Sequence, residues 1–152
     1  MITLVRTGSD DPDLLSLVKS LDADLIIRNG DAQPYYSQFN RLDKIKHAVV
    51  AYDDGVPSGC GAIKQYSADT MEIKRMFVDP AHRRKGIAES IVKELEKWAE
   101  ELGFTRCILE SSINQQEAIA LYRKRGFTQI PNFDQYIGID TSICLEKHLN
   151  KK

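Results

Sequence analysis

The clearest hydrophobic pattern lies between residues 87 and 102, where apolar side chains recur every three or four positions. This spacing places them on one face of a helix and leaves the other face polar. Gly103 comes after the last apolar position, where a left-handed residue commonly ends a helix. The pattern predicts an amphipathic helix whose apolar face packs on a core. The members of that face are Ile87, Ile91, Leu95, Trp98 and Leu102.

Strand-like segments flank this helix. Residues 71–78 precede it and end at Asp79-Pro80, because proline cannot donate to a strand ladder. Residues 107–110 follow it as a short apolar strand, and a second helix is predicted from Asn114 to Arg125. A strand–helix–strand crossover of this length makes the two strands parallel. The first helix then begins at the carboxyl end of the first strand, where such sheets bind ligands.

The amino-terminal part of the chain predicts a short strand and two helices. The strand covers Ile2–Arg6, and the helix after it is capped by Ser9 or Asp10. A further helix is predicted from Ala23 to Asn29, closed by Gly30.

The remaining strands predict an antiparallel arrangement. Residues 48–52 and 60–66 flank Asp53-Asp54-Gly55, which is typical of a hairpin turn. With the strand that precedes the amphipathic helix, they form a meander. A last strand is expected at residues 141–149, antiparallel to residues 127–130. Together the elements predict an α/β (α+β) fold built on a mixed sheet.

Composition narrows the class of protein. The chain has 152 residues, of which 42% are hydrophobic and 28% charged, which suits one globular domain over residues 1–152. A formal net charge of −1 argues against nonspecific attachment to nucleic acids or membranes. The sequence shows no signal peptide and no apolar run long enough to cross a bilayer, so a cytoplasmic location is expected.

The cysteines and histidines do not predict a metal site. Cys60, Cys107 and Cys144 are far apart and form no Cys-x-x-Cys pair, so we expect reduced thiols in a core. The three histidines do not cluster with acids or cysteines at the spacing of metal ligands. We therefore expect no structural metal.

A basic turn, Arg83-Arg84-Lys85-Gly86-Ile87-Ala88, opens the amphipathic helix. The first N–H groups of a helix have no carbonyl partner, and the helix dipole leaves positive charge there, so an anion can satisfy both. Gly86 has no Cβ and lets a diphosphate approach the backbone. The turn is neither a Walker loop nor a Gly-x-Gly-x-x-Gly fingerprint. The alternative interpretation is a basic, solvated start of a helix.

Residues 72–127 resemble the GNAT superfamily of acyl-CoA-dependent N-acyltransferases. Its signature, Gln/Arg-x-x-Gly-x-Gly/Ala, is met by Arg83, Gly86 and Ala88. Arg84 differs from the glycine that many members carry, so the turn must accommodate a side chain there. Further matching positions are Phe77, Val78, Asn114, Ala118, Tyr122, Gly126 and Phe127.

The resemblance implies a GNAT fold: a mixed central sheet of six to seven strands, antiparallel in its amino-terminal half, with about four helices. It implies that the strand at residues 71–78 carries a bulge and splays from its parallel neighbour at residues 105–110 to hold acetyl-CoA. Asn114 can also cap its own helix. The implied cofactor-binding residues are Met76, Phe77, Val78, Arg83, Arg84, Lys85, Gly86, Ile87, Ala88, Asn114 and Ala118.

The resemblance also implies catalytic residues. Tyr122 matches the tyrosine that protonates the leaving thiolate; the alternative is a core tyrosine with a hydrogen-bonded tip. Glu72 stands where some members have the general base, and strand alternation would place it on the face of Met76 and Val78. The alternative for Glu72 is a solvated carboxylate paired with a lysine. Glu110 is a second carboxylate near the splay, expected at the acceptor pocket.

The implied activity is transfer of an acetyl group from acetyl-CoA to a primary amine of a small molecule, amino acid or peptide within a ternary complex. Tyr35 or Tyr36 is expected to line the acceptor pocket. A negatively lined pocket would suit polyamines or aminoglycosides, whereas an inward Arg28, Arg41 or Arg75 would suit an amino-acid carboxylate. A homodimer is an expectation from the family.

Two other functions remain open for the same residues. One is a noncatalytic acyl-CoA-binding sensor or interaction domain on the same fold. Tyr122 and a nearby carboxylate favour an enzyme over that alternative. The other is a nucleic-acid binder that uses the basic turn, which the overall charge disfavours.

Overall fold

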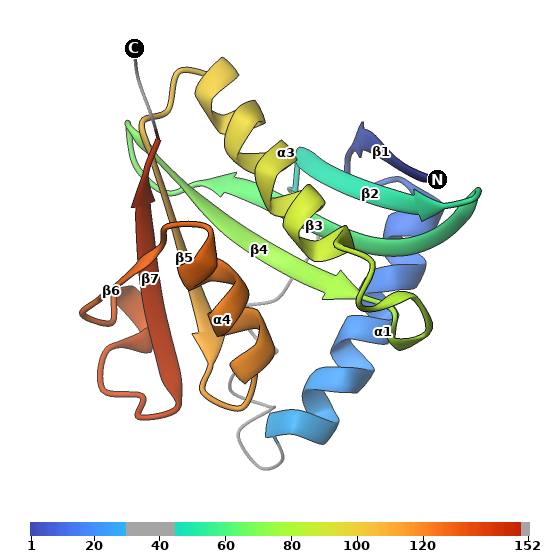
Figure 1. The fold of residues 1–152 in the computed structure, drawn as a ribbon. Helices are drawn as coiled ribbons and strands as arrows, with labels where there is room; N and C mark the ends of the chain where they lie inside the picture. Colours follow the sequence, from blue (N-terminus) through green and yellow to red (C-terminus); the bar gives the residue numbers. More distant parts are fainter. Residues whose placement is uncertain (30–44, 150–152) are drawn as a thin grey trace.

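A mixed sheet of seven strands forms the centre of the computed structural model, which describes residues 1–29 and 45–149 (Figure 1). The strand order is β1-β2-β3-β4-β5-β7-β6. Strands β4 and β5 run parallel, and the other described neighbours pair antiparallel. The pairing of β5 with β7 was not predicted, whereas the antiparallel meander, the parallel pair and the pairing of β6 with β7 were. The strands are β1 (Ile2–Thr7), β2 (His47–Asp53), β3 (Val56–Gln65), β4 (Thr70–Val78), β5 (Arg106–Ser112), β6 (Thr128–Ile130) and β7 (Ser142–His148).

Helices cover both faces of this sheet. Figure 1 shows α3 and α4 in front of the sheet and α1 behind it. Two separate apolar cores correspond to the two faces, one under α3 and α4 and the other under α1. The helices are α1 (Pro12–Asn29), α3 (Ile87–Glu101) and α4 (Gln116–Lys124), with short 3₁₀ turns η2 (Pro80–His82) and η3 (Asp134–Tyr136).

Helix α1 corrects two predictions. It runs unbroken from Pro12 to Asn29, so the separate helix expected to start at Ala23 is its second half. Neither glycine nor proline interrupts this stretch, and nothing local ends the helix there. The cap is Asp11 rather than Ser9 or Asp10, because its carboxylate accepts from the N–H of Asp13 at 2.8 Å.

The ends of α3 and α4 share one hydrogen-bonding motif. Gly103, at φ +93°, donates to Glu100, and Phe104 donates to Ala99 at 3.0 Å. This pair of bonds is a Schellman motif, and it confirms the predicted glycine stop. The same pattern ends α4, where Gly126 is at φ +99° and the Phe127 N–H donates to the Tyr122 carbonyl at 2.9 Å.

Helix α4 is shorter than predicted at its start. It begins at Gln116 with Gln115, not Asn114, at the N-cap. The Ser112 hydroxyl accepts from the Asn114 N–H at 3.1 Å, so Asn114 belongs to the turn between β5 and α4. The expected hairpin is present, with Asp54 and Gly55 both at positive φ between β2 and β3.

Strand β4 carries the expected bulge and splay. Cys60 pairs with Phe77 and Ala62 with Lys74, so β4 holds one residue more than β3 across this interval. Arg75 lies inside it with φ +65°. Pairing between β4 and β5 ends at Ile73 and Leu109, although both strands continue beyond that point. The sheet is therefore split between the carboxyl-terminal halves of β4 and β5.

Candidate active site

A pocket of about 580 Å³ opens at this split, between the end of β4 and the first turns of α3 and α4. It includes Leu21 of α1, which belongs to the core on the other side of the sheet. The pocket therefore reaches through the split. Its lining residues are Leu21, Met76, Phe77, Val78, Arg83, Arg84, Gly86, Ile87, Ala88, Glu89, Gln115, Glu117, Ala118, Leu121 and Tyr122.

The floor of the pocket at α3 is main chain. Gly86 stands at the N-cap with φ +77° and gives α3 no side-chain cap. The first-turn N–H groups of a helix have no intrahelical acceptor, and the helix dipole adds positive charge to them. A Cβ on Gly86 would meet nothing within 4 Å, so its positive φ, rather than crowding, favours glycine. This end of the pocket suits a diphosphate.

The three basic side chains of the turn go to different places. Arg83 donates from Nε to the Val78 carbonyl at 2.9 Å, and its guanidinium lies 6.0 Å from the Phe77 ring. Arg84 lines the pocket with φ +68°, so the turn accommodates the side chain that departs from the family glycine. Lys85 is not among the lining residues. Its Nζ lies 2.6 Å from Oδ2 of Asp53.

Tyr122 reaches the pocket from α4 and is 5% exposed. Its ring meets Phe127 edge to face at 5.7 Å, so the residue that ends α4 also packs against the tyrosine. Burial, with a contribution from the Glu110 charge, raises the pKa of the Tyr122 hydroxyl well above its ordinary value. The hydroxyl is therefore protonated at neutral pH and able to act as an acid.

Glu72 lies on the other face of the sheet from the one predicted. Met71, Ile73, Met76 and Val78 all pack in the core under α3, so Glu72 faces away from them. The bulge at residue 75 shifts the alternation by one and places Met76 on the α3 side. Burial raises the pKa of Glu72, and Lys74, whose Nζ is 3.7 Å from its carboxylate, opposes this.

Glu110 shares that face with Glu72. Its β5 neighbour Leu109 pairs with Leu145 of the α3-side core, whereas Glu110 pairs with Cys144 of a separate core. Burial raises the pKa of Glu110 to about 7, although a hydrogen bond with Ser142 opposes the shift. Its Oε2 is buried with no hydrogen-bond partner among the described residues.

An aromatic cluster that the sequence analysis did not single out adjoins these carboxylates. Tyr66 and Phe133 lie 5.4 Å apart between ring centroids, and Phe133 and Tyr136 lie 5.6 Å apart. The charges of Glu110 and Glu72 help to raise the pKa of Tyr136, although burial is the larger cause. Nothing local in the sequence marks these rings, because Tyr66 follows β3 and the other two follow β6, and they meet only when these distant segments fold together.

Several predicted site residues fall outside this constellation. Tyr35, Tyr36 and Arg41 lie outside the described residues. Asn114 does not line the pocket, whereas the neighbouring Gln115 does. The Arg75 side chain is fully buried, with Nη1 3.7 Å from Oδ1 of Asp22 in α1. Leu21, Glu89, Glu117 and Leu121 line the pocket without having been predicted, since their alignment depends on how the helices pack.

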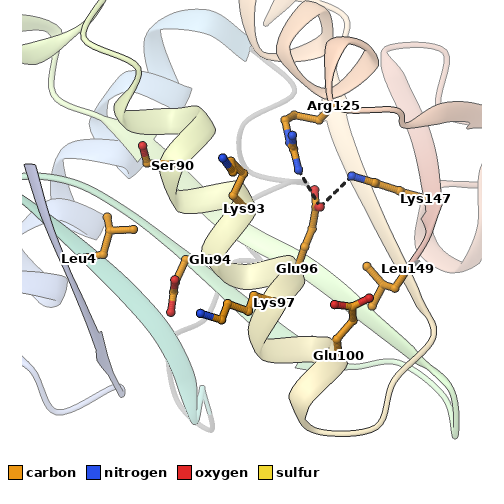
Figure 2. Close-up of a pocket in the computed structure, with 10 residues that line it drawn as sticks. All are labelled: Leu4, Ser90, Lys93, Glu94, Glu96, Lys97, Glu100, Arg125, Lys147 and Leu149. Atoms are coloured by element: carbon orange, nitrogen blue, oxygen red, sulfur yellow. Dashed lines mark hydrogen bonds and ion pairs between the residues drawn. The ribbon is translucent and has the colours of Figure 1, made fainter. Parts of the chain in front are cut away.

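A second pocket, of about 550 Å³, lies along the outer side of α3 (Figure 2). In it Glu96 accepts from Arg125 at 3.0 Å and from Lys147 at 2.8 Å, which links α3 to the end of α4 and to β7. None of the predicted site residues lines it. Within residues 1–29 and 45–149, no group of three His, Cys, Asp or Glu is placed to hold a metal. None of the described helices is long and apolar enough to span a membrane.

The chain is similar in sequence to known acetyltransferases. The profile of the Acetyltransferase (GNAT) family matches residues 15–127. An IAA acetyltransferase of Azospirillum brasilense is 31% identical over 159 residues, covering 97% of this chain and 98% of the relative.

Solved structures share the whole fold. The “putative acyl-CoA N-acyltransferase” of Klebsiella pneumoniae superposes with a TM-score of 0.83 at 27% identity, covering 99% of each chain. The PaiA N-acetyltransferase of Thermoplasma acidophilum, solved in complex with coenzyme A, has a TM-score of 0.69 at 18% identity. That likeness covers 97% of this chain and 99% of the other.

Proposed function

Because the chain belongs to the GNAT acetyltransferase family, we propose that it transfers an acetyl group from acetyl-CoA to a primary amine in a ternary complex. The observation that carries this proposal is the pocket that reaches through the split sheet. It combines an anion-binding helix start, an exposed strand backbone and a protonated tyrosine in one space.

The helical side of the split suits the cosubstrate. First-turn N–H groups of α3 and the Arg84 side chain are placed to bind a diphosphate. Residues 76–78 line the pocket where β4 has lost its β5 partner, so backbone groups on that edge, apart from the Val78 carbonyl that accepts from Arg83, can pair with the amides of a pantetheine arm. Acetyl-CoA bound in this way supplies an acyl thioester that an amine can attack.

The residues around the split are suited to the proton transfers. The attacking amine must lose a proton, and Glu110, with a pKa of about 7, is ionised in a useful fraction at neutral pH. As the new N–C bond forms and the C–S bond breaks, Tyr122 donates its proton to the departing thiolate, and the second proton that leaves the product nitrogen restores the tyrosine hydroxyl. We assign Glu110 rather than Glu72 as the base, because the Glu110 charge acts on Tyr122.

The amine acceptor is proposed to bind on the face of the sheet opposite α3, and this face favours a cationic amine. Glu72 and Glu110 both face it, with the rings of Tyr66 and Phe133 nearby. Glu72 is assigned to attract the ammonium form of the acceptor before the proton is removed. Arg75 is committed to an ion pair with Asp22, which weakens the case for an amino-acid carboxylate as the recognised group.

The test is titration of acetyl-CoA by calorimetry, followed by thiol release with a panel of polyamines, aminoglycosides, amino acids and peptides. We expect binding, turnover with at least one amine, and loss of about 10²–10⁴ in kcat for Tyr122→Phe at unchanged acetyl-CoA affinity. Tyr52→Phe is the matched control, since its hydroxyl bonds Asp13 away from the pocket. Binding without turnover on any amine would indicate a sensor instead, and unchanged turnover in Tyr122→Phe would remove the tyrosine from the mechanism.

A further inference from the structure

Asp53 contacts the basic turn at the start of α3 from outside the pocket. It lies at the end of β2, and its Oδ2 accepts from Lys85 Nζ at 2.6 Å and contacts His82 Nδ1 at 3.0 Å. The Asp53 side chain is 9% exposed, whereas that of Lys85 is half exposed. Thirty-two residues separate Asp53 from Lys85 in the chain. A carboxylate on the β2–β3 hairpin is thus bound to both ends of the segment 82–85.

The segment that Asp53 holds has an unusual backbone. Arg84 and Gly86 have φ values of +68° and +77°, on either side of Lys85. A non-glycine residue in this region is strained, so the conformation needs outside support. Pinning Lys85 restrains both left-handed neighbours at once, and these two residues set the direction of the N–H groups at the start of α3.

Other contacts fix the two ends of the loop. The Asp79 N–H donates to the Ser58 carbonyl at 2.8 Å, and the Asp79 carboxylate accepts from the Ala81 N–H at 2.9 Å. Arg83 is tied to Val78. At the other end, the Gly86 carbonyl accepts from the N–H of Ser90 at 3.1 Å and from its hydroxyl at 3.0 Å. Among the described residues, the Lys85 contact with Asp53 is the tether between Arg83 and Gly86.

We propose that Asp53 is a positioning residue for the acyl-CoA site, which acts through Lys85 to hold Arg84 and Gly86 in the conformation that receives the diphosphate. The inference rests on the proposed function. It assigns Lys85 a structural part in place of a direct contact with phosphate, and it gives the β2–β3 hairpin a part in cosubstrate binding.

The two roles of Lys85 predict opposite effects of removing Asp53. If Lys85 positions the turn, loss of Asp53 loosens the turn and weakens the binding of coenzyme A. If Lys85 binds phosphate, loss of Asp53 releases the ammonium to the ligand and strengthens binding. The sign of the change in affinity therefore separates the two roles.

The experiment titrates coenzyme A into the wild type, Asp53→Ala, the near-isosteric Asp53→Asn, and the control Asp54→Asn. Asp54 is the adjacent exposed acid, paired with the amino terminus rather than with the turn. We expect about tenfold weaker binding for both Asp53 variants, no change for Asp54→Asn, and kcat at saturating acetyl-CoA close to that of the wild type. Hydrogen exchange of residues 83–89 should be faster in both Asp53 variants.

Each outcome has one meaning. Unchanged or tighter binding in Asp53→Asn overturns the inference while leaving the proposed function intact. If the wild type itself binds no coenzyme A, the proposed function fails, and this inference fails with it. If Asp53→Ala does not fold, Asp53→Asn alone decides, because it keeps the size of the side chain.

Discussion

Glu110 is the carboxyl group on which the proposed chemistry depends most. Burial raises its pKa to about 7, so it changes charge within the physiological range. A general base works best when its pKa lies near the working pH, because it is then both available and strong enough to take a proton. The raised pKa, with a charge that acts on Tyr122, makes Glu110 a testable base.

The pH dependence of kcat/KM should rise through pH 7 as Glu110 loses its proton. We expect Glu110→Gln to remove this ascending limb and to lower kcat/KM by roughly 10²–10⁴. Glu72→Gln should keep the limb and raise the KM of the amine, because its proposed part is attraction. A profile in which Glu72→Gln loses the limb and Glu110→Gln retains it would exchange the two assignments.

Single residues differ in how far the sequence could place them. Gly86 was placed at the pocket because its role follows from a local turn, and Tyr122 because it matches the tyrosine of the family. Glu72 was put on the wrong face because one extra residue in β4 reverses strand alternation, and no residue type near Arg75 announces the bulge. The contact of Asp53 with the basic turn was not predicted, since it depends on how the β2–β3 hairpin and the loop before α3 meet in space.

The packing of α3 on β3 depends on the absence of one side chain. A Cβ on Gly61 would come within 2.5 Å of Met76 Sδ and 2.8 Å of Ile91 Cγ2. Helix α3 can thus approach the sheet closely at Gly61, and Met76, which lines the pocket, fills the adjacent space. The distance between α3 and the sheet therefore also fixes the wall of the site.

Gly61→Ala should lower the free energy of unfolding by about 1–3 kcal/mol, because overpacking forces α3 or Met76 to move. The measurement is the urea midpoint at unchanged slope. Gly8→Ala is the control, since its Cβ would meet nothing closer than 3.6 Å. Equal midpoints for the two variants would contradict the expected overpacking between α3 and β3.

Helices and strands with strong periodicity were predicted well, and their junctions less well. The stripe that begins at Ile87 and the glycine stops of α3 and α4 follow from local rules. The division of α1 at Ala23 was wrong, because no residue in this stretch gives the helix a reason to stop. The insertion of β7 between β5 and β6 is a long-range pairing that no local pattern encodes.

The stability of the whole protein should vary with pH because of its buried carboxyls. The pKa of Glu110 rises from 4.5 to about 7 on folding, so the folded state holds this proton more tightly. Its contribution to stability is complete below pH 4.5 and is lost as the pH rises through 7. The pKa of Asp53 is held near 2 by Lys85 and His82, so its contribution is present above pH 3.8 and is lost in acid.

Denaturant unfolding at pH 5 and pH 8.5 tests this sign. From pH 5 to pH 8.5, the free energy of unfolding of Glu110→Gln should rise relative to that of the wild type by on the order of 1–3 kcal/mol. The reason is that the variant has no carboxylate to ionise in the interior. Asp54→Asn serves as the control, since that carboxylate is exposed. A difference between Glu110→Gln and wild type that stays constant with pH would contradict the raised pKa.

The parting of β4 and β5 beyond Ile73 and Leu109 perforates the sheet. Under the proposed function, acetyl-CoA and the amine enter from opposite faces of the sheet, and they meet only at the gap between the two strands. Neither has to depart before the other arrives, and spent coenzyme can back out without disturbing the acetylated product. A bisubstrate inhibitor for this protein would therefore need a thin linker between two larger groups. Only the linker would lie in the gap between β4 and β5.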